Sequence, residues 1–132
     1  LKAGEPLHNG IFESTARALL RAVGDLRVRS SASAAAGVAQ IERNSLRVAY
    51  SGDIRFVVVR SGKILLATQD ETPVARDVAS GALRPEQALT DPRRNALDRA
   101  VRAGHSHFAQ VYFHELAPGD WVVGASDGLW GH

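Results

Sequence analysis

The sequence of 132 residues predicts an α+β fold, in which antiparallel sheets are covered by helices. Three observations carry this prediction. Strand-like segments fill most of 37–67, and helical spacing replaces that pattern over 73–104. Two further strand-like segments then occupy most of 108–125. Strands, then helices, then strands again favour an antiparallel sheet with helices packed on it.

The first half of the chain predicts one helix and four strands. Between Ile11 and Val23 apolar residues recur at helical spacing, which indicates a helix with one buried face. In the second strand Leu46, Val48 and Tyr50 alternate with Arg47 and Ala49, so one face of that strand is expected to be buried. Short turns between the strands predict an antiparallel meander. The four strands are expected at 37–42, 46–50, 56–59 and 64–67.

Three helices and two closing strands are predicted in the second half. Pro85 marks the start of the short second helix, because proline suits the first turn of a helix. Pro118-Gly119-Asp120 supplies turn residues between the closing strands. The helices are expected at 74–79, from 85 onward and at 94–102, and the strands at 108–116 and 121–125.

Composition argues against several classes of protein. Hydrophobic residues make up 45% of the chain, yet no apolar run is long enough to span a bilayer, and no signal peptide is visible, so no membrane partner is expected. The net charge is +2 and the arginines are scattered, which argues against a nucleic-acid surface. The chain has no cysteine, so any metal must use oxygen or histidine ligands, and a cytoplasmic location is expected. It has no methionine either, so we expect a fragment or a processed chain.

Two carboxylates stand out because each lies at the end of a predicted strand. Asp127 follows the apolar run 121–125 closely, and a carboxylate there loses solvation unless a positive charge meets it. Gly128 comes next and has no β-carbon, so the backbone can turn tightly and leave the carboxylate exposed. Asp53 lies between two strands, where it is either a metal ligand or a turn residue that accepts backbone hydrogen bonds.

Six ordered segments carry a resemblance to a known family. They are Tyr50–Arg55, Ser61–Lys63, Thr68–Pro73, Gly81–Ala88, Asp91–Leu97 and Ala125–Trp130. Together they resemble the PP2C family of metal-dependent serine/threonine protein phosphatases. Ala125–Trp130 is similar to the second signature of that family. Asp91–Leu97 favours its bacterial branch over the related sporulation and stress-response phosphatases, which act on anti-sigma-factor antagonists.

The resemblance implies a fold, a reaction and a site. The complete domain would be an αββα sandwich with two or three Mn²⁺ or Mg²⁺ ions at one end of its sheets. A metal-bridging water would hydrolyse phosphoserine or phosphothreonine on a protein. Asp127 would be a ligand of the second and the additional ion, Asp53 would serve the additional ion, and Gly128 would permit the turn. No catalytic residue beyond the metal ligands and no organic cofactor is implied. The partners would be a phosphoprotein substrate and a cognate serine/threonine kinase.

The chain also departs from the family pattern. The first signature, an Asp-Gly-x-Gly with a bridging ligand, and the C-terminal aspartate are both absent, so 1–132 is expected to be a partial domain that is inactive alone. Glu71 stands where the family usually has histidine, and Ile54 where it has serine. A pseudophosphatase that binds a partner without catalysis therefore remains the alternative of a different class.

Histidines offer a rival metal site. His105 and His107 are two apart, and His114 lies further along, but no carboxylate accompanies them at a recognisable spacing. We interpret them as surface histidines. Asp120 is expected to be a turn residue, and Trp121 and Trp130 are expected to pack in the core or at its rim.

Overall fold

The computed structural model describes residues 14, 18, 33–102, 105–106 and 110–129. The helix predicted over 11–23 lies outside the described residues except at Ser14 and Ala18, and both of these are helical. Among the described helices none is long and apolar enough to cross a membrane.

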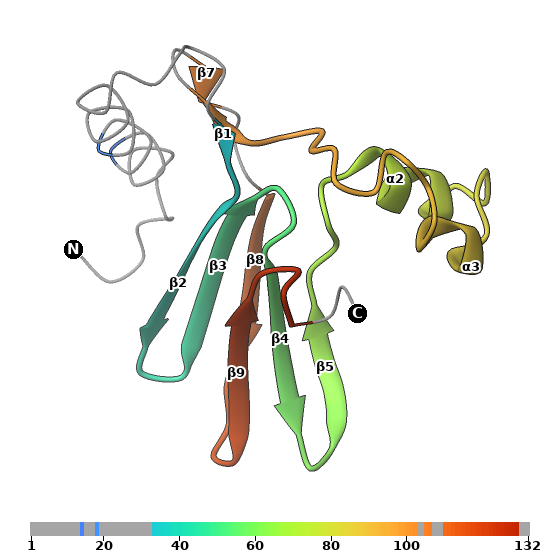
Figure 1. Ribbon diagram of the computed structural model, residues 1–132. Helices are drawn as coiled ribbons and strands as arrows, with labels where there is room; N and C mark the ends of the chain where they lie inside the picture. Colours follow the sequence, from blue (N-terminus) through green and yellow to red (C-terminus); the bar gives the residue numbers. More distant parts are fainter. Residues whose placement is uncertain (1–13, 15–17, 19–32, 103–104, 107–109, 130–132) are drawn as a thin grey trace.

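The described strands form three antiparallel sheets, and two short helices follow the fifth strand (Figure 1). This arrangement confirms the predicted α+β class. The first sheet has the order β2-β3-β8, from Ala36–Glu42, Ser45–Ser51 and Gln110–Glu115. The second has the order β5-β4-β9, from Lys63–Ala67, Arg55–Arg60 and Asp120–Ala125. The small third sheet is β1-β6-β7, from Ser33–Ala34, Val101–Arg102 and His105–Ser106. The helices are α2, Pro73–Ala79, and α3, Pro85–Ala88.

The four early strands form two hairpins in different sheets, so the predicted meander is wrong. β2 pairs with β3 and β4 with β5, but β3 pairs on its other side with β8 and β4 with β9. The connection 52–54 therefore carries the chain from one sheet to the other. Alternation along a strand reveals which face is buried and leaves the neighbouring strand undetermined, which is why the sequence pattern missed this crossing.

The core lies between the two larger sheets. Leu46, Val48 and Tyr50 of β3 pack with Phe56 and Val58 of β4, and each of these side chains is buried. The predicted burial of Leu46, Val48 and Tyr50 is thus confirmed, but Ala49 on the opposite face is also buried, at 1% exposure, so the prediction that only one face of this strand is buried is wrong at that residue. Burial of such side chains contributes roughly 1.5–3 kcal/mol each to folding relative to exposure.

Phe56 fixes how closely the two sheets approach. A β-carbon added to Gly124, its neighbour on β9, would lie 2.7 Å from the Phe56 ring. A β-carbon added to Gly37 on β2 would lie 2.6 Å from the same ring. The ring therefore occupies the space that side chains at both glycines would need, and it ties the two sheets together near one end of β4.

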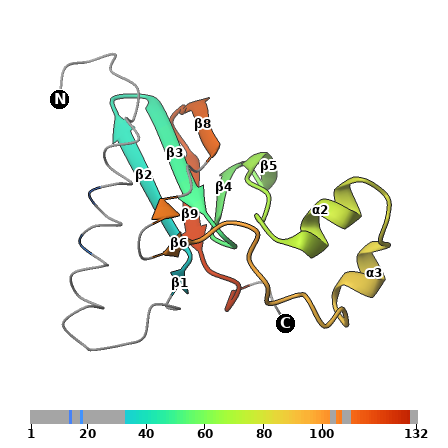
Figure 2. The same ribbon diagram turned by 90° about the horizontal axis from the view of Figure 1, so that it is seen from above.

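Helix α3 begins at Pro85 as predicted, and α2 begins one residue before the predicted 74–79, at Pro73, so that both helices have proline in the first turn. Thr72 caps α2, because its hydroxyl oxygen accepts a hydrogen bond from the Ala75 backbone N–H at 3.1 Å. In both views the two helices extend to one side of the larger sheets (Figures 1 and 2).

The third helix, predicted over 94–102, is absent, and the prediction is wrong. Residues 92–95 form turns, and the chain then becomes extended and joins the small sheet as β6. Tertiary contacts outweigh the helical spacing there. The Asp98 N–H donates to the Glu71 carbonyl at 2.8 Å, and Ala100 and Val101 are buried.

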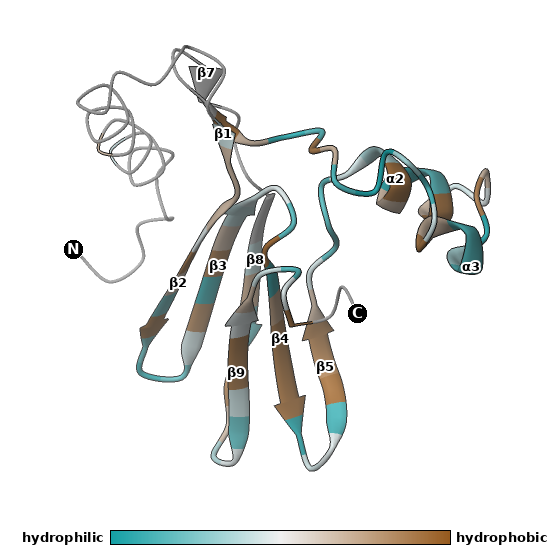
Figure 3. Ribbon diagram, in the orientation of Figure 1, coloured by the Kyte–Doolittle hydropathy of each residue, from teal (hydrophilic) through white to brown (hydrophobic). Residues whose placement is uncertain are grey.

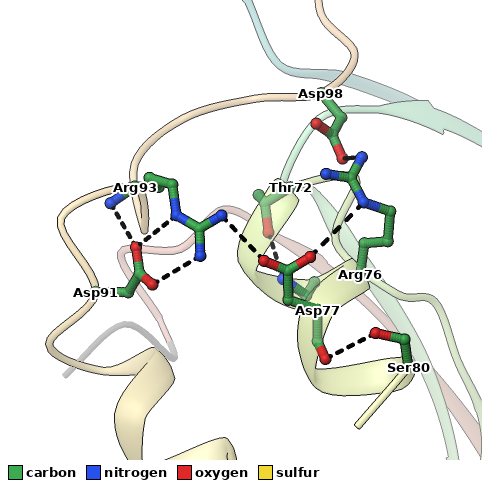
Figure 4. A network of polar contacts seen from close by, with 8 residues as sticks. Thr72, Arg76, Asp77, Ser80, Asp91, Arg93 and Asp98 are labelled. Carbon is green, nitrogen blue, oxygen red and sulfur yellow. Dashed lines mark hydrogen bonds and ion pairs between the residues drawn. The ribbon is translucent and has the colours of Figure 1, made fainter. Parts of the chain in front are cut away.

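Ion pairs hold the segment after α3 against α2 (Figure 4). Arg93 contacts the carboxylates of both Asp91 and Asp77, at 2.9 and 3.0 Å. Arg76 of α2 reaches Asp98 at 2.7 Å. Hydrogen bonds from Arg93 lower the pKa of Asp91 below its usual value. These pairs are exposed, so they are expected to position the segment more than to stabilise the fold.

Trp121 lies on the outer face of the second sheet and is 73% exposed, so the predicted packing of this side chain in the core or its rim is wrong. The core face of β9 is instead supplied by Val122, opposite Val58. Brown, hydrophobic residues run along β4, β5 and β9 in Figure 3, and the exposed side chains Ile64 and Leu65 belong to them. Trp130 lies outside the described residues.

Candidate metal centre

Strand pairing brings Asp53 and Asp127 to the same end of the second sheet. β4 and β9 are antiparallel, with Arg55 opposite Ala125. Asp53 lies two residues before Arg55, and Asp127 lies two residues after Ala125. Because the strands run in opposite directions, both carboxylates leave the sheet where β4 begins and β9 ends.

The structure also places Asp70 at this end, beyond the last residue of β5. Burial is the main cause that raises the pKa of Asp53, and the negative charges of Asp127 and Asp70 raise it further. A hydrogen bond from the Asp53 backbone and the charge of Arg55 act in the opposite direction. Asp53 is half-buried, whereas Asp127 is exposed.

This group of oxygens fits a hard divalent cation as a partial site. Carboxylates are the ligands that Mg²⁺ and Mn²⁺ prefer, and a cation would relieve the mutual repulsion of these carboxylates. Within the described ranges, however, no group of three or more acidic, histidine or cysteine side chains could hold a metal ion. Any ion bound here would need further ligands or water molecules to complete its coordination.

Gly128 forms part of a turn after β9, in which the Leu129 N–H donates to the Ser126 carbonyl at 3.1 Å. The turn predicted there exists, but the reason given for glycine is not supported. The φ of Gly128 lies outside the left-handed region, and an added β-carbon would find its nearest contact at 3.7 Å, on Ser126 Oγ. A side chain at this position would therefore cause no strain.

Gly52 is the glycine that this end of the sheet requires, and the sequence reading missed its role. Its φ is +93°, a conformation that other residues rarely adopt. An added β-carbon would also lie 2.8 Å from the Ala35 β-carbon. The Ser51-Gly52-Asp53 break in the strand pattern was the available signal.

Asp70 and Glu71 hold the chain on both sides of Asp53. Asp70 accepts two hydrogen bonds from Arg55, each 2.6 Å long. Glu71 accepts a hydrogen bond from the Gly52 N–H at 3.2 Å, and its own N–H donates to the Gly52 carbonyl at 2.9 Å. In the sequence, only their place in the segment Thr68–Pro73 of the family resemblance indicated a role for these two residues.

The opposite end of the β4–β9 pair is closed by a different carboxylate. Asp120 accepts two hydrogen bonds from Arg60 and one from the Ala117 N–H, the last of these closing the turn. The predicted turn role of Asp120 is confirmed. The Arg60 guanidinium is the main cause that lowers the pKa of Asp120 to about 2.

The structure describes only part of the rival histidine set, and no group of three or more possible metal ligands is found among the described residues. His105 lies in β7 and His107 lies outside the described residues. His114 lies in β8 opposite Leu46, and its Nε2 atom is buried with no hydrogen-bond partner in the described part of the chain. The His114 side chain as a whole is half-buried, so the expectation of a surface histidine holds for only part of this side chain.

Known proteins of one kind match the chain in sequence, although no family model matches it. The serine/threonine protein phosphatase PstP of Mycobacterium tuberculosis is 34% identical over 86 residues, which are 65% of this chain and 16% of PstP. A putative protein phosphatase 2C-type of Streptococcus pyogenes is 32% identical over 92 residues, 70% of this chain and 37% of the relative. The matched stretch is thus less than half the length of either relative.

Solved structures share the fold. The Mycobacterium tuberculosis serine/threonine phosphatase PstP/Ppp has a TM-score of 0.71 and 28% identity, over 88% of this chain and 48% of that one. The PstP catalytic domain in complex with two manganese ions has a TM-score of 0.71 and 25% identity, over 89% and 47%. The shared architecture is therefore the antiparallel α+β fold of bacterial serine/threonine phosphatases. This chain belongs to their PP2C-type family and spans about half the length of these solved structures.

Proposed function

We propose that this chain forms part of a metal-dependent protein phosphatase that hydrolyses phosphoserine or phosphothreonine on proteins. The observation that supports it most is the meeting of Asp53 and Asp127 at one end of the β4–β9 pair, in a fold shared with a phosphatase that contains two manganese ions. The substrate would be a phosphoprotein, and a cognate serine/threonine kinase would produce it. The absence of cysteine fits the cytoplasm as the compartment.

Asp53 and Asp127 are the residues that would hold a divalent cation, Mn²⁺ or Mg²⁺. A divalent ion bound among carboxylates supplies Lewis-acid chemistry, lowering the pKa of water and neutralising charge on a phosphoryl group. The role of the chain is to present the two carboxylates from adjacent strands, at a fixed separation. Phe56 serves this role because its ring packs against both Gly124 and Gly37 near the beginning of β4, and Gly52 serves it by turning the chain between the sheets.

Replacement of Asp127 tests this function. Asp127→Asn in the complete gene product should lower Mn²⁺-dependent hydrolysis of a phosphopeptide by about 100-fold or more. Mutation of a residue that only hydrogen-bonds to a metal ligand typically lowers metal affinity or activity by about 10–100-fold, and loss of the ligand itself should lower it at least as much. The control is Asp77→Asn in α2, which makes the same chemical change beside Arg93. Wild-type turnover by Asp127→Asn would remove Asp127 from the site.

A further inference from the structure

Asp53 needs a rigid backbone to serve as a ligand. It lies in the connection that crosses between the sheets, and it faces the negative charges of Asp127 and Asp70. Mutual repulsion would push a loosely held carboxylate away from its neighbours. Something in the chain must therefore hold this connection in place.

The dipeptide Asp70-Glu71 contacts the residues on both sides of Asp53. Asp70 binds Arg55 through two parallel hydrogen bonds of 2.6 Å, an arrangement that fixes direction as well as distance. Glu71 exchanges two hydrogen bonds with Gly52, one from its backbone and one from its side chain. The two side chains are well buried, at 17% exposure for Asp70 and 8% for Glu71.

The dipeptide is itself anchored to the fold at several points. The Tyr50 hydroxyl donates to the carbonyl of Gln69, directly before it, at 2.6 Å. The Glu71 carboxylate also faces Arg99 at 3.4 Å, and its carbonyl accepts from the Asp98 N–H at 2.8 Å. Thr72, the cap of α2, follows directly. Movement of Gly52 or Arg55 would therefore disturb a connected set of contacts, most of them partly buried.

We propose that Asp70 and Glu71 are positioning residues of the candidate metal centre, which hold Gly52 and Arg55 so that Asp53 keeps its place opposite Asp127. This inference rests on the proposed metal-dependent function. Glu71 stands where the family usually has histidine, and in this chain its carboxylate accepts a hydrogen bond from the Gly52 N–H.

Two variants with opposite charge changes separate positioning from simple electrostatics. Glu71→Met keeps the length of the side chain but removes its acceptors and a negative charge. Arg55→Met removes a positive charge near the site. If only the local field mattered, Mn²⁺ would bind more weakly to Glu71→Met and more tightly to Arg55→Met. If position matters, both variants should bind Mn²⁺ about tenfold or more weakly.

Binding is measured on the complete gene product labelled with ¹⁵N-glycine. Paramagnetic Mn²⁺ should broaden the Gly52 and Gly128 amide signals, which flank Asp53 and Asp127, and should spare Gly119 in the distant turn. The Mn²⁺ concentration at half-broadening then reports occupancy without any activity assay. Arg47→Met, on the outer face of β3 over the Phe113 ring, is the matched control and should leave that concentration unchanged.

Each result decides between the proposals. Weaker binding in both variants supports the positioning role, whereas unchanged binding, or tighter binding in Arg55→Met, overturns it. Absence of broadening in the wild type would overturn the metal centre itself, and the positioning role with it.

If the methionine variants do not fold, Arg55→Lys is the variant to measure, because lysine keeps the positive charge but cannot form the two parallel hydrogen bonds to Asp70. Arg55→Lys should bind Mn²⁺ several-fold more weakly, and wild-type affinity in it would overturn the proposal.

Discussion

At the scale of single residues, the buried hydroxyl groups of Ser51 and Thr68 are expected to differ in their contribution to the free energy of unfolding. Ser51 is fully buried, and its hydroxyl has no hydrogen-bond partner among the residues that the structure describes. Thr68 is equally well buried, but its hydroxyl accepts a hydrogen bond from the Phe56 N–H at 2.9 Å. An unpaired buried hydroxyl costs free energy, whereas loss of a paired one leaves its partner unsatisfied.

We therefore expect Ser51→Ala to leave the free energy of unfolding unchanged or to raise it by up to about 1–2 kcal/mol. Thr68→Val is the contrasting variant and should lower it by about 1–3 kcal/mol, because the Phe56 N–H loses its acceptor. Urea denaturation of both proteins measures the difference. A loss of more than about 1 kcal/mol in Ser51→Ala would show that its hydroxyl has a partner after all.

Asp120 should make stability depend on pH in the acid range. Its pKa is about 2 in the folded protein, mainly through Arg60, and about 3.9 in the unfolded chain. Below about pH 4 the unfolded state binds the proton more readily, so this contribution to stability is complete above that pH and is lost as pH falls through about 2. Urea midpoints of wild type and Asp120→Asn should differ at pH 6 and converge toward pH 2. A difference between the two urea midpoints that stays constant from pH 6 to pH 2 would contradict the claim that the ionised Asp120 carboxylate stabilises the fold.

At the scale of secondary-structure elements, the contact between β4 and β9 depends on the absence of side chains. Gly124→Ala would place a β-carbon 2.7 Å from the Phe56 ring. The ring and the two strands must then move apart, and we expect a loss of about 1–3 kcal/mol in the free energy of unfolding. Gly128→Ala, four residues further on, is the control and should change it by less than about 0.5 kcal/mol, because no atom lies within 3.7 Å. Equal losses in both variants would contradict the close approach at Phe56.

Local patterns predicted the elements better than their partners. Residues 46–50 revealed their buried face through alternation, and Pro85 revealed the start of α3. The pairing of β4 with β9 joins segments about 65 residues apart, and no local pattern encodes it. The helix predicted at 94–102 failed for a related reason, since Asp98 bonds to Glu71, which is distant in sequence. The prediction that Trp121 packs in the core or at its rim failed because apolar residues lie on both faces of β9. The apolar run alone does not show which of the two faces packs against the other sheet.

At the scale of the whole molecule, the candidate site is a product of the topology. Asp53 and Asp127 were both predicted from their places next to strands and from the family resemblance. Their meeting point depends on the order β5-β4-β9, which also delivers Asp70 to the same end. The contacts of Glu71 with Gly52 were not predicted, because they depend on how the connection between the sheets folds back.

The central claim is that Asp53 and Asp127 bind one divalent cation together. Anomalous diffraction at the manganese edge, from crystals of the complete gene product grown with Mn²⁺, tests it most directly. The account predicts a manganese peak within about 2.0–2.6 Å of a carboxylate oxygen from each residue. Ordered carboxylates in the same crystals with no manganese peak between them would contradict it.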